Sequence, residues 1–270
     1  MNFIETGNPV GRPVVFLHGV TFGSWMWRAC TSSLSDYRCI LPTLPGHGPE
    51  AQDTHVSMKY LVEETAALIR RVSGEQKVYL VGHSLGAQLA LHLTSAHPDL
   101  VEGTLAMSAL MRSVTPAYHV FMRPLSPLLP RILSSPLVRQ KLADAFDLTA
   151  GPIRNEFLAG LDKIGSTTFR SYTVTNQECR VPRRLQHCSV PIICLCGQKE
   201  VSEMRRSLQD LAQSNRRTLR AYQLKGARQK LRIHGMGLLR KELGGAIDAF
   251  GNLDSGELRK NHIVRLAVGK

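Results

Sequence analysis

Gly82-His83-Ser84-Leu85-Gly86 is the stretch that decides the fold of this 270-residue chain. An apolar run at 77–81, which predicts a strand, leads into it, and a helical segment at 87–96 follows. The pattern G-x-S-x-G between a strand and a helix is typical of a nucleophilic serine, because the sharp turn raises the hydroxyl above the sheet. The two glycines lack the Cβ atoms that would clash in such a turn. We therefore predict Ser84 as a nucleophile.

Two backbone amides near Ser84 are candidate donors for an oxyanion hole. The amide of Leu85 opens the predicted helix, and a helix N-terminus stabilises negative charge that develops beside it. His18-Gly19 follows the apolar run at 13–17, where the loop that supplies a second donor is expected. Val20 is the best candidate to supply that second amide.

Further apolar runs continue the alternation of strands and helices. Strands are predicted at 13–17, 38–41, 100–108, 190–196 and 219–224, and helices at 57–72 and 202–212. This alternation predicts an α/β fold with a mostly parallel, doubly wound sheet that is covered on both faces.

The segment 112–187 differs from the rest of the chain. Prolines cluster between positions 116 and 136, no strong strand pattern occurs, and apolar residues remain frequent. These features predict a mostly helical insertion rather than a linker. The chain then divides into a first core part at 1–111, an insertion at 112–187, and a second core part at 188–270 with an atypical C-terminal segment.

Composition excludes several classes of protein. The formal charge is +13 at pH 7, which could favour nucleic acid, but base-reading motifs are absent and aromatic residues make up only 6%. We expect no nucleic-acid partner. No apolar stretch is long enough to cross a bilayer, and no signal peptide is evident, so we expect no membrane association. None of the six cysteines has metal-ligand spacing, and free buried thiols suit a cytoplasmic location.

Several motifs together make the chain resemble the α/β-hydrolase superfamily. The matching pieces are Phe16-Leu17-His18-Gly19, Trp25 and Trp27, Leu44-Pro45-Gly46-His47-Gly48, Gly82-His83-Ser84-Leu85-Gly86 and Val190-Pro191-Ile192-Ile193-Cys194-Leu195-Cys196-Gly197. Their order and spacing match along residues 10–225. The resemblance implies an eight-stranded, mostly parallel sheet with a helical cap after the sixth strand, and 112–187 is similar to that cap. The serine disfavours the dehalogenase and epoxide hydrolase branches, which have aspartate at this position.

The triad order in this fold is nucleophile, acid, histidine. The acid is expected in the loop after the strand that ends at Cys196, where Glu200 is the first candidate and Glu203 the second. Its role would be to accept a hydrogen bond from the imidazole and to stabilise the imidazolium.

The histidine departs from the family pattern. In the loop where the family has G-x-x-H, this chain has Gln229, which cannot act as a base. The nearest histidine is His234, between residues that suit a loop, and His262 is a weaker candidate in a polar tail. Either a longer loop brings His234 to Ser84, or the C-terminal segment has diverged and the triad is broken.

The expected activity is hydrolysis of a small ester-like or related carbonyl substrate through a covalent acyl-enzyme. The triad would be Ser84, His234 and Glu200, without a metal or an organic cofactor. His18, His47 and His83 are expected to be hydrogen-bonded scaffold. The alternative is a catalytically impaired hydrolase fold that serves as a ligand-binding or interaction protein. Oligomeric state is left open.

Overall fold

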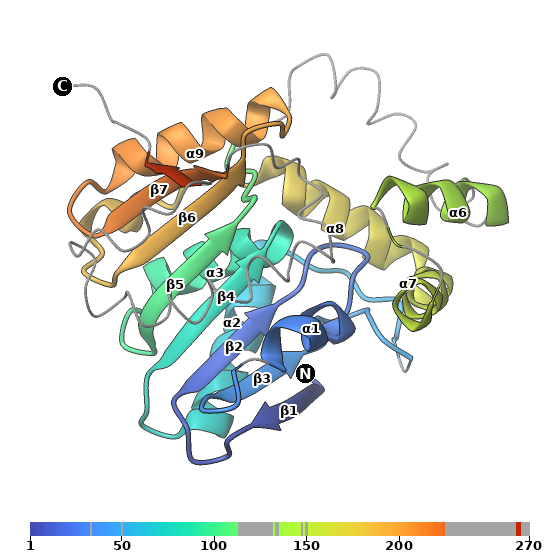
Figure 1. The fold of residues 1–270 in the computed structure, drawn as a ribbon, viewed down its shortest axis with the longest axis horizontal. Helices are drawn as coiled ribbons and strands as arrows, with labels where there is room; N and C mark the ends of the chain where they lie inside the picture. The colour runs from blue at the N-terminus through green and yellow to red at the C-terminus, as the bar shows by residue number, and fades with distance from the viewer. Residues whose placement is uncertain are drawn as a thin grey trace.

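The computed structural model describes residues 1–32, 34–49, 51–112, 132, 135–146, 148 and 151–224, together with the backbone of 263–265. Within these residues, eight strands form one sheet in the order β1-β3-β2-β4-β5-β6-β7-β8 (Figure 1). The strands are β1 Phe3–Gly7, β2 Pro13–Leu17, β3 Arg38–Pro42, β4 Val78–His83, β5 Val101–Met107, β6 Ile192–Gly197, β7 Leu219–Leu224 and β8 Ile263–Arg265. The helices are η1 Ser24–Trp27, α1 Arg28–Thr31, α2 Met58–Ser73, α3 Leu85–Ala96, α6 Pro136–Ala145, α7 Pro152–Lys163, α8 Ser166–Glu178, η3 Arg183–His187 and α9 Ser202–Ser214.

The sheet is mostly parallel, which confirms the fold class predicted from the sequence. In sheet order, β3, β2, β4, β5, β6 and β7 pair in parallel with their neighbours. The two edge strands, β1 and β8, pair antiparallel. The expectation that the insertion follows the sixth strand was wrong by one. In the described part of the chain, five strands, β1 to β5, precede the insertion. The sheet reaches eight strands because three, β6 to β8, follow the insertion, and β8 forms the edge opposite β1.

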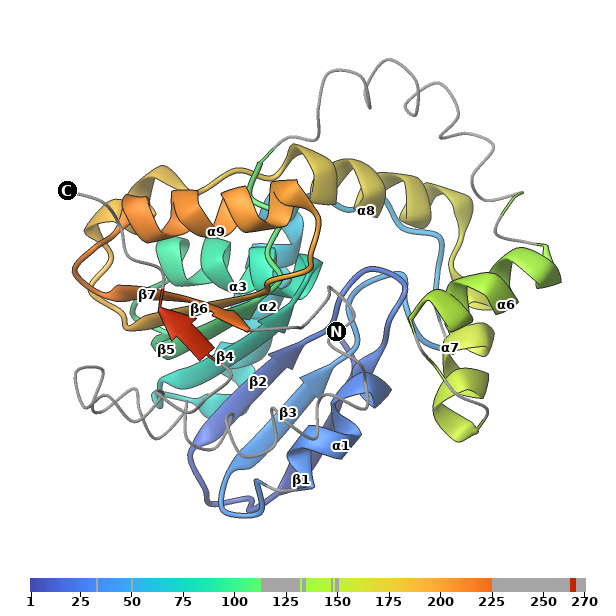
Figure 2. The same cartoon turned by 45° about the horizontal axis from the view of Figure 1, so that its top comes forward.

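Helices cover both faces of this sheet (Figure 2). α2, α3 and α9 pack on one face, where Val15, Leu80 and Cys194 of the strands join their core. η1, α1 and α7 pack on the other face, against strand residues such as Phe16 and Val81. Burial on both faces is the reason that the central strands have continuous apolar runs instead of an alternating pattern.

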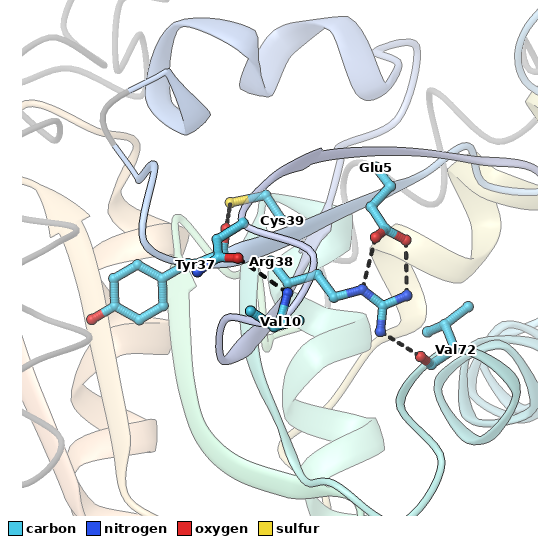
Figure 3. Close-up of polar contacts among 7 residues, drawn as sticks. Glu5, Val10, Tyr37, Arg38, Cys39 and Val72 are labelled. Carbon is cyan, nitrogen blue, oxygen red and sulfur yellow. Dashed lines mark hydrogen bonds and ion pairs between the residues drawn. The ribbon is translucent and has the colours of Figure 1, made fainter.

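An arginine on β3 ties the edge strand β1 to the rest of the fold (Figure 3). Nε and Nη2 of Arg38 donate to the two carboxylate oxygens of Glu5, at 2.8 and 2.9 Å. Nη1 donates to the carbonyl of Val72, near the end of α2, at 2.7 Å. The guanidinium also lowers the pKa of the Glu5 carboxyl, chiefly through these hydrogen bonds. One side chain therefore joins β1, β3 and α2.

The loop after β3 is fastened to the start of α8. Asp53 accepts hydrogen bonds from the backbone amides of Thr167 and Thr168, at 3.2 and 2.7 Å. The Thr168 hydroxyl accepts from the amide of Thr54 at 2.7 Å and donates to its carbonyl at 3.1 Å. The first amides of a helix have no partner within the helix, so Asp53 caps α8 from a distant part of the sequence.

The described part of 112–187 contains α6, α7, α8 and η3 and no strand. α6 packs on α7, and α7 in turn contacts η1 beside the sheet. All six cysteines are free and buried, and Cys194 and Cys196, two residues apart on β6, face the same side of the sheet. None of the described helices has both the length and the apolar composition that crossing a bilayer requires.

Candidate active site

Ser84 lies in a strained turn between β4 and α3. Its backbone has φ 55° and ψ −119°, in the left-handed region that non-glycine residues rarely adopt. A Cβ on Gly82 would lie 2.2 Å from the carbonyl oxygen of Gly86, and one on Gly86 would lie 2.0 Å from that of Leu17. The amide of Ser84 donates to the carbonyl of Met107 at 2.9 Å, which ties the turn to the end of β5. Only glycine fits at either flank, as the motif requires.

The loop after β2 approaches Ser84 closely. A Cβ on Gly19 would lie 3.3 Å from the Cβ of Ser84, so the backbone of this loop passes directly beside the nucleophile candidate. Val20 follows Gly19 in this loop and is partly buried, and Leu85 directly follows Ser84 and opens α3. The two amides predicted as oxyanion donors therefore belong to the segments that adjoin Ser84.

Two buried histidines hold this loop in place. Nδ1 of His18 lies 2.8 Å from the carbonyl of Gly19, and its Nε2 accepts from the amide of Leu44 at 3.0 Å. Nε2 of His47 accepts from the amide of Thr21 at 3.3 Å. Burial lowers the pKa of His18 to about 3 and that of His47 to about 4, so both rings are neutral near pH 7. Hydrogen-bonded scaffold is what the sequence predicted for them.

His83 differs from these two. Both of its ring nitrogens are buried and have no hydrogen-bond partner among the described residues. Its ring meets Phe22 edge to face, with centroids 6.2 Å apart. Burial lowers its pKa to about 4. Among the described residues His83 therefore packs against an aromatic side chain without a hydrogen bond, and its role as hydrogen-bonded scaffold stays a prediction.

Glu200 lies in the loop after β6, where the sequence placed the acid. It is only 2% exposed. Its Oε1 accepts from the hydroxyl of Ser108 at 2.8 Å and from the amide of Gly197 at 2.7 Å, whereas Oε2 is buried without a partner among the described residues. Burial raises the pKa of Glu200, and the hydrogen bonds from Gly197 and Ser108 oppose that rise.

Glu203 has a different environment. It lies in the first turn of α9, and its carboxylate accepts from the hydroxyl of Ser202 at 2.9 Å. Its own backbone amide and Ser202 lower its pKa. Of the two candidate acids, Glu200 alone is a buried carboxylate with an oxygen that accepts no well-formed hydrogen bond from a described residue.

Adjacent strand ends bring the described site residues together. Ser84 follows β4, Ser108 follows β5 and Glu200 lies in the loop after β6, and these three strands are neighbours in the sheet. His234, Gln229 and His262 lie outside the described residues. Ser108 is a contact that the sequence reasoning missed. The available signal was a serine directly after the apolar run Leu105-Ala106-Met107, at a strand end.

A cavity of about 970 Å³ lies beside this region. It is lined by β1, by the loops after β2 and β3, and by α7, and neither Ser84 nor Glu200 is among its lining residues. In the described part of the chain, no group of three or more His, Cys, Asp or Glu side chains is arranged to hold a metal ion.

Comparison with known proteins shows which protein family the chain matches. A sequence profile described as the alpha/beta hydrolase family matches residues 14–227. The chain is 31% identical over 102 residues to a pimeloyl-[acyl-carrier protein] methyl ester esterase of Aeromonas hydrophila, covering 37% of this chain and 38% of that protein. It is 29% identical over 105 residues to coelenterazine h 2-monooxygenase of Renilla reniformis, covering 38% of this chain and 34% of that protein. The matches thus span little more than a third of these relatives' lengths.

The arrangement of the backbone is similar over almost the whole chain. The solved structure of MenH from S. aureus superposes with a TM-score of 0.77 at 17% sequence identity, covering 93% of this chain and 99% of that one. At this level of identity the similarity shows the fold.

Proposed function

Because the chain belongs to the alpha/beta hydrolase family, we propose that it is a serine hydrolase acting on a small ester-like or related carbonyl substrate. The observation that carries the proposal is the backbone conformation of Ser84 and its position beside Gly19. Ser84 is held at φ 55° at the N-terminus of α3, with the backbone of Gly19 against its side chain. Strain of this kind persists where the surroundings enforce it and clusters at functional sites. The similarity to a methyl ester esterase supports the choice of an ester.

The mechanism we propose is acyl transfer in two steps. Oγ of Ser84 attacks the carbonyl carbon while its proton passes to His234, and the amides of Val20 and Leu85 bind the oxyanion. The tetrahedral intermediate collapses, the imidazolium protonates the departing alcohol, and an acyl-enzyme remains. His234 then deprotonates a water molecule as its oxygen attacks the acyl carbon; the second tetrahedral intermediate collapses, the imidazolium returns that proton to Oγ of Ser84, and the acid is released. Glu200 stabilises the imidazolium in each step.

A second candidate function rests on Gln229. This residue occupies the sequence position where the family has its histidine, and it cannot accept the serine proton. If His234 does not replace that base, the fold serves as a ligand-binding or interaction module in which Ser84 is unreactive. In either case we propose that the substrate or ligand is a small molecule and that 112–187 forms the cap over its site. The six buried free thiols support a cytoplasmic location.

Hydrolysis of short-chain p-nitrophenyl esters distinguishes the two functions. The wild type should hydrolyse them, and both Ser84→Ala and His234→Ala should lose activity by about a thousandfold or more, because members of a triad act as a unit. A fluorophosphonate should label Ser84 in the wild type and not in Ser84→Ala. An inactive wild type that the probe leaves unlabelled would falsify the serine hydrolase and favour the module. Activity in His234→Ala equal to wild type would exclude that residue as the base.

A further inference from the structure

Ser108 has the same positive φ as the nucleophile candidate on the neighbouring strand. It follows β5 directly, its φ is 55°, and it is only 1% exposed. Its amide donates to the carbonyl of Leu195 at 2.8 Å, which fixes it against the end of β6. Glycine adopts this conformation at no steric cost, so a serine here costs free energy that a glycine would avoid. An observed outlier of this kind points to a use for the side chain.

The hydroxyl of Ser108 has one described partner, the carboxylate of Glu200. It donates to Oε1 at 2.8 Å, and the amide of Gly197 donates to the same oxygen at 2.7 Å. Two donors from two strand ends therefore fix one carboxylate oxygen. The other oxygen, Oε2, is buried and makes no well-formed hydrogen bond with a described residue, although the Cys196 thiol also lies against the carboxylate. A buried carboxylate oxygen without a donor is costly, so a group that donates to Oε2 is expected.

We propose that Ser108 is the positioning residue of the acid: it fixes Oε1 of Glu200 so that Oε2 is presented to the histidine of the triad. This inference rests on the proposed function, because the imidazole is the donor that the mechanism supplies. With Ser108 in place the carboxylate cannot rotate about its last bond without losing a hydrogen bond. The carboxylate is therefore oriented before any substrate binds.

The hydrogen bond from Ser108 also favours the ionised form of Glu200. Burial raises the pKa of this carboxyl, and the groups that face it are Ser108 after β5, Gly197 and Cys196 of β6, and Arg205 of α9. A donor to a carboxylate stabilises the charged form, so removal of the Ser108 hydroxyl raises the pKa of Glu200 further. The positioning role and the ionisation of the acid therefore depend on the same contact.

Three substitutions separate the hydroxyl from the backbone conformation. Ser108→Ala removes the donor and keeps the strained φ, Ser108→Gly removes the donor and relieves the strain, and Ser108→Thr keeps a hydroxyl. Ser73→Ala is the matched control, because Ser73 is also buried but its hydroxyl donates to the carbonyl of Ile69 within α2. Thermal unfolding of each variant verifies that it is folded.

Kinetics and carboxyl NMR give two independent readouts. We expect Ser108→Ala and Ser108→Gly to lower kcat for a p-nitrophenyl ester about ten- to hundredfold with little change in KM, the range that a charge-assisted hydrogen bond supplies. Ser108→Thr keeps the donor but adds a β-branched side chain at a positive φ, so it should recover only part of this loss, and Ser73→Ala should match the wild type. The ¹³C resonance of the Glu200 side chain, assigned with Glu200→Gln, should titrate at higher pH in Ser108→Ala than in the wild type.

The outcomes that contradict the inference are distinct from failure of the proposed function. Full activity in Ser108→Gly, with the Glu200 titration unchanged, would show that the residue serves only the turn. If the wild type is inactive and Ser84 is not labelled by a fluorophosphonate, the serine hydrolase proposal fails. The carboxyl titration still tests whether Ser108 donates to Glu200 in that case. An unchanged Glu200 pKa in Ser108→Ala contradicts this hydrogen bond, and a raised pKa supports it.

Discussion

Single residues fix the geometry around Ser84, and Gly86 is the most constrained of them. The Cβ of an alanine there would lie within 2.0 Å of the Leu17 carbonyl and 2.7 Å of that of His18. Both neighbours are backbone atoms, one at the end of β2 and one at the start of the loop beside Ser84, so the conflict cannot be relieved by a change of rotamer. The same substitution would therefore affect both the stability of the fold and the proposed oxyanion hole.

Gly86→Ala should lower the free energy of unfolding by about 1–3 kcal/mol, the usual cost of overpacking, and should reduce activity with it. Gly160→Ala is the matched control, because Gly160 also lies in a helix, α7, but a Cβ there would meet nothing within 4 Å. It should stabilise the protein by up to about 1 kcal/mol, through helix propensity. Urea unfolding of both variants measures the difference. Equal effects of the two substitutions would contradict the steric argument.

At the scale of elements, the cap on α8 comes from outside the helix. Asp53 replaces the local capping side chain that α8 lacks, since its N-cap residue is Gly165 and no side chain there caps it. A Cβ on Gly165 would lie 2.3 Å from the Asp53 carboxylate, which shows how closely the loop packs against the helix. The position of α8 over the sheet therefore depends on the loop after β3.

Asp53→Ala should cost about 0.5–2 kcal/mol of stability at pH 7, the range for loss of a helix cap, and Asp53→Asn should cost less because it keeps one acceptor. The amide of Thr168 is the first cause of the lowered pKa of Asp53. Its stabilising effect is therefore present above the unfolded pKa, near 3.9, and is lost as the pH falls through the folded value. Urea unfolding at pH 7 and at pH 3 should show the wild-type advantage shrinking in acid. An advantage independent of pH would contradict the charge-assisted cap.

For the molecule as a whole, the proposed acid opposes stability. The pKa of Glu200 is raised by burial, so the folded state holds its proton more tightly than the unfolded chain. The free energy of unfolding is therefore highest, as far as this group is concerned, below the unfolded pKa of about 4.3, where Glu200 is protonated in both states. It falls as the pH rises through the folded pKa. Retaining this buried, ionised carboxylate therefore costs the fold stability at neutral pH.

Glu200→Gln should remove that cost, because an amide accepts from Ser108 and Gly197 without carrying charge. We expect the variant to gain stability relative to wild type as the pH rises from about 5 to 8, and to lose ester hydrolysis. Chemical unfolding at several pH values, together with the p-nitrophenyl ester assay, measures both. A wild type that remains the more stable form at pH 8 would contradict a penalty from the buried charge.

The parts of the fold that the sequence predicted are those in which local pattern and burial agree. The strand at 192–197 has a continuous apolar run because both of its faces are covered, and the elbow at Ser84 has its flanking glycines because backbone carbonyls leave no room for a Cβ. β1 was not predicted, because all of its residues are exposed and it has no apolar pattern. The contact between Ser108 and Glu200 depends on the register of β5 and β6, which no local pattern encodes.

The exposed edge strand β1 has a consequence for how copies of the chain behave in concentrated solution. Its outer side lies at the end of the sheet, and Phe3 and Ile4 are 36% and 46% exposed. An edge of this kind is a template on which a second chain could add a strand and begin aggregation. The ion pair of Glu5 with Arg38 places charge in the middle of this five-residue strand. The contact that fastens β1 to the fold therefore also limits its tendency to aggregate.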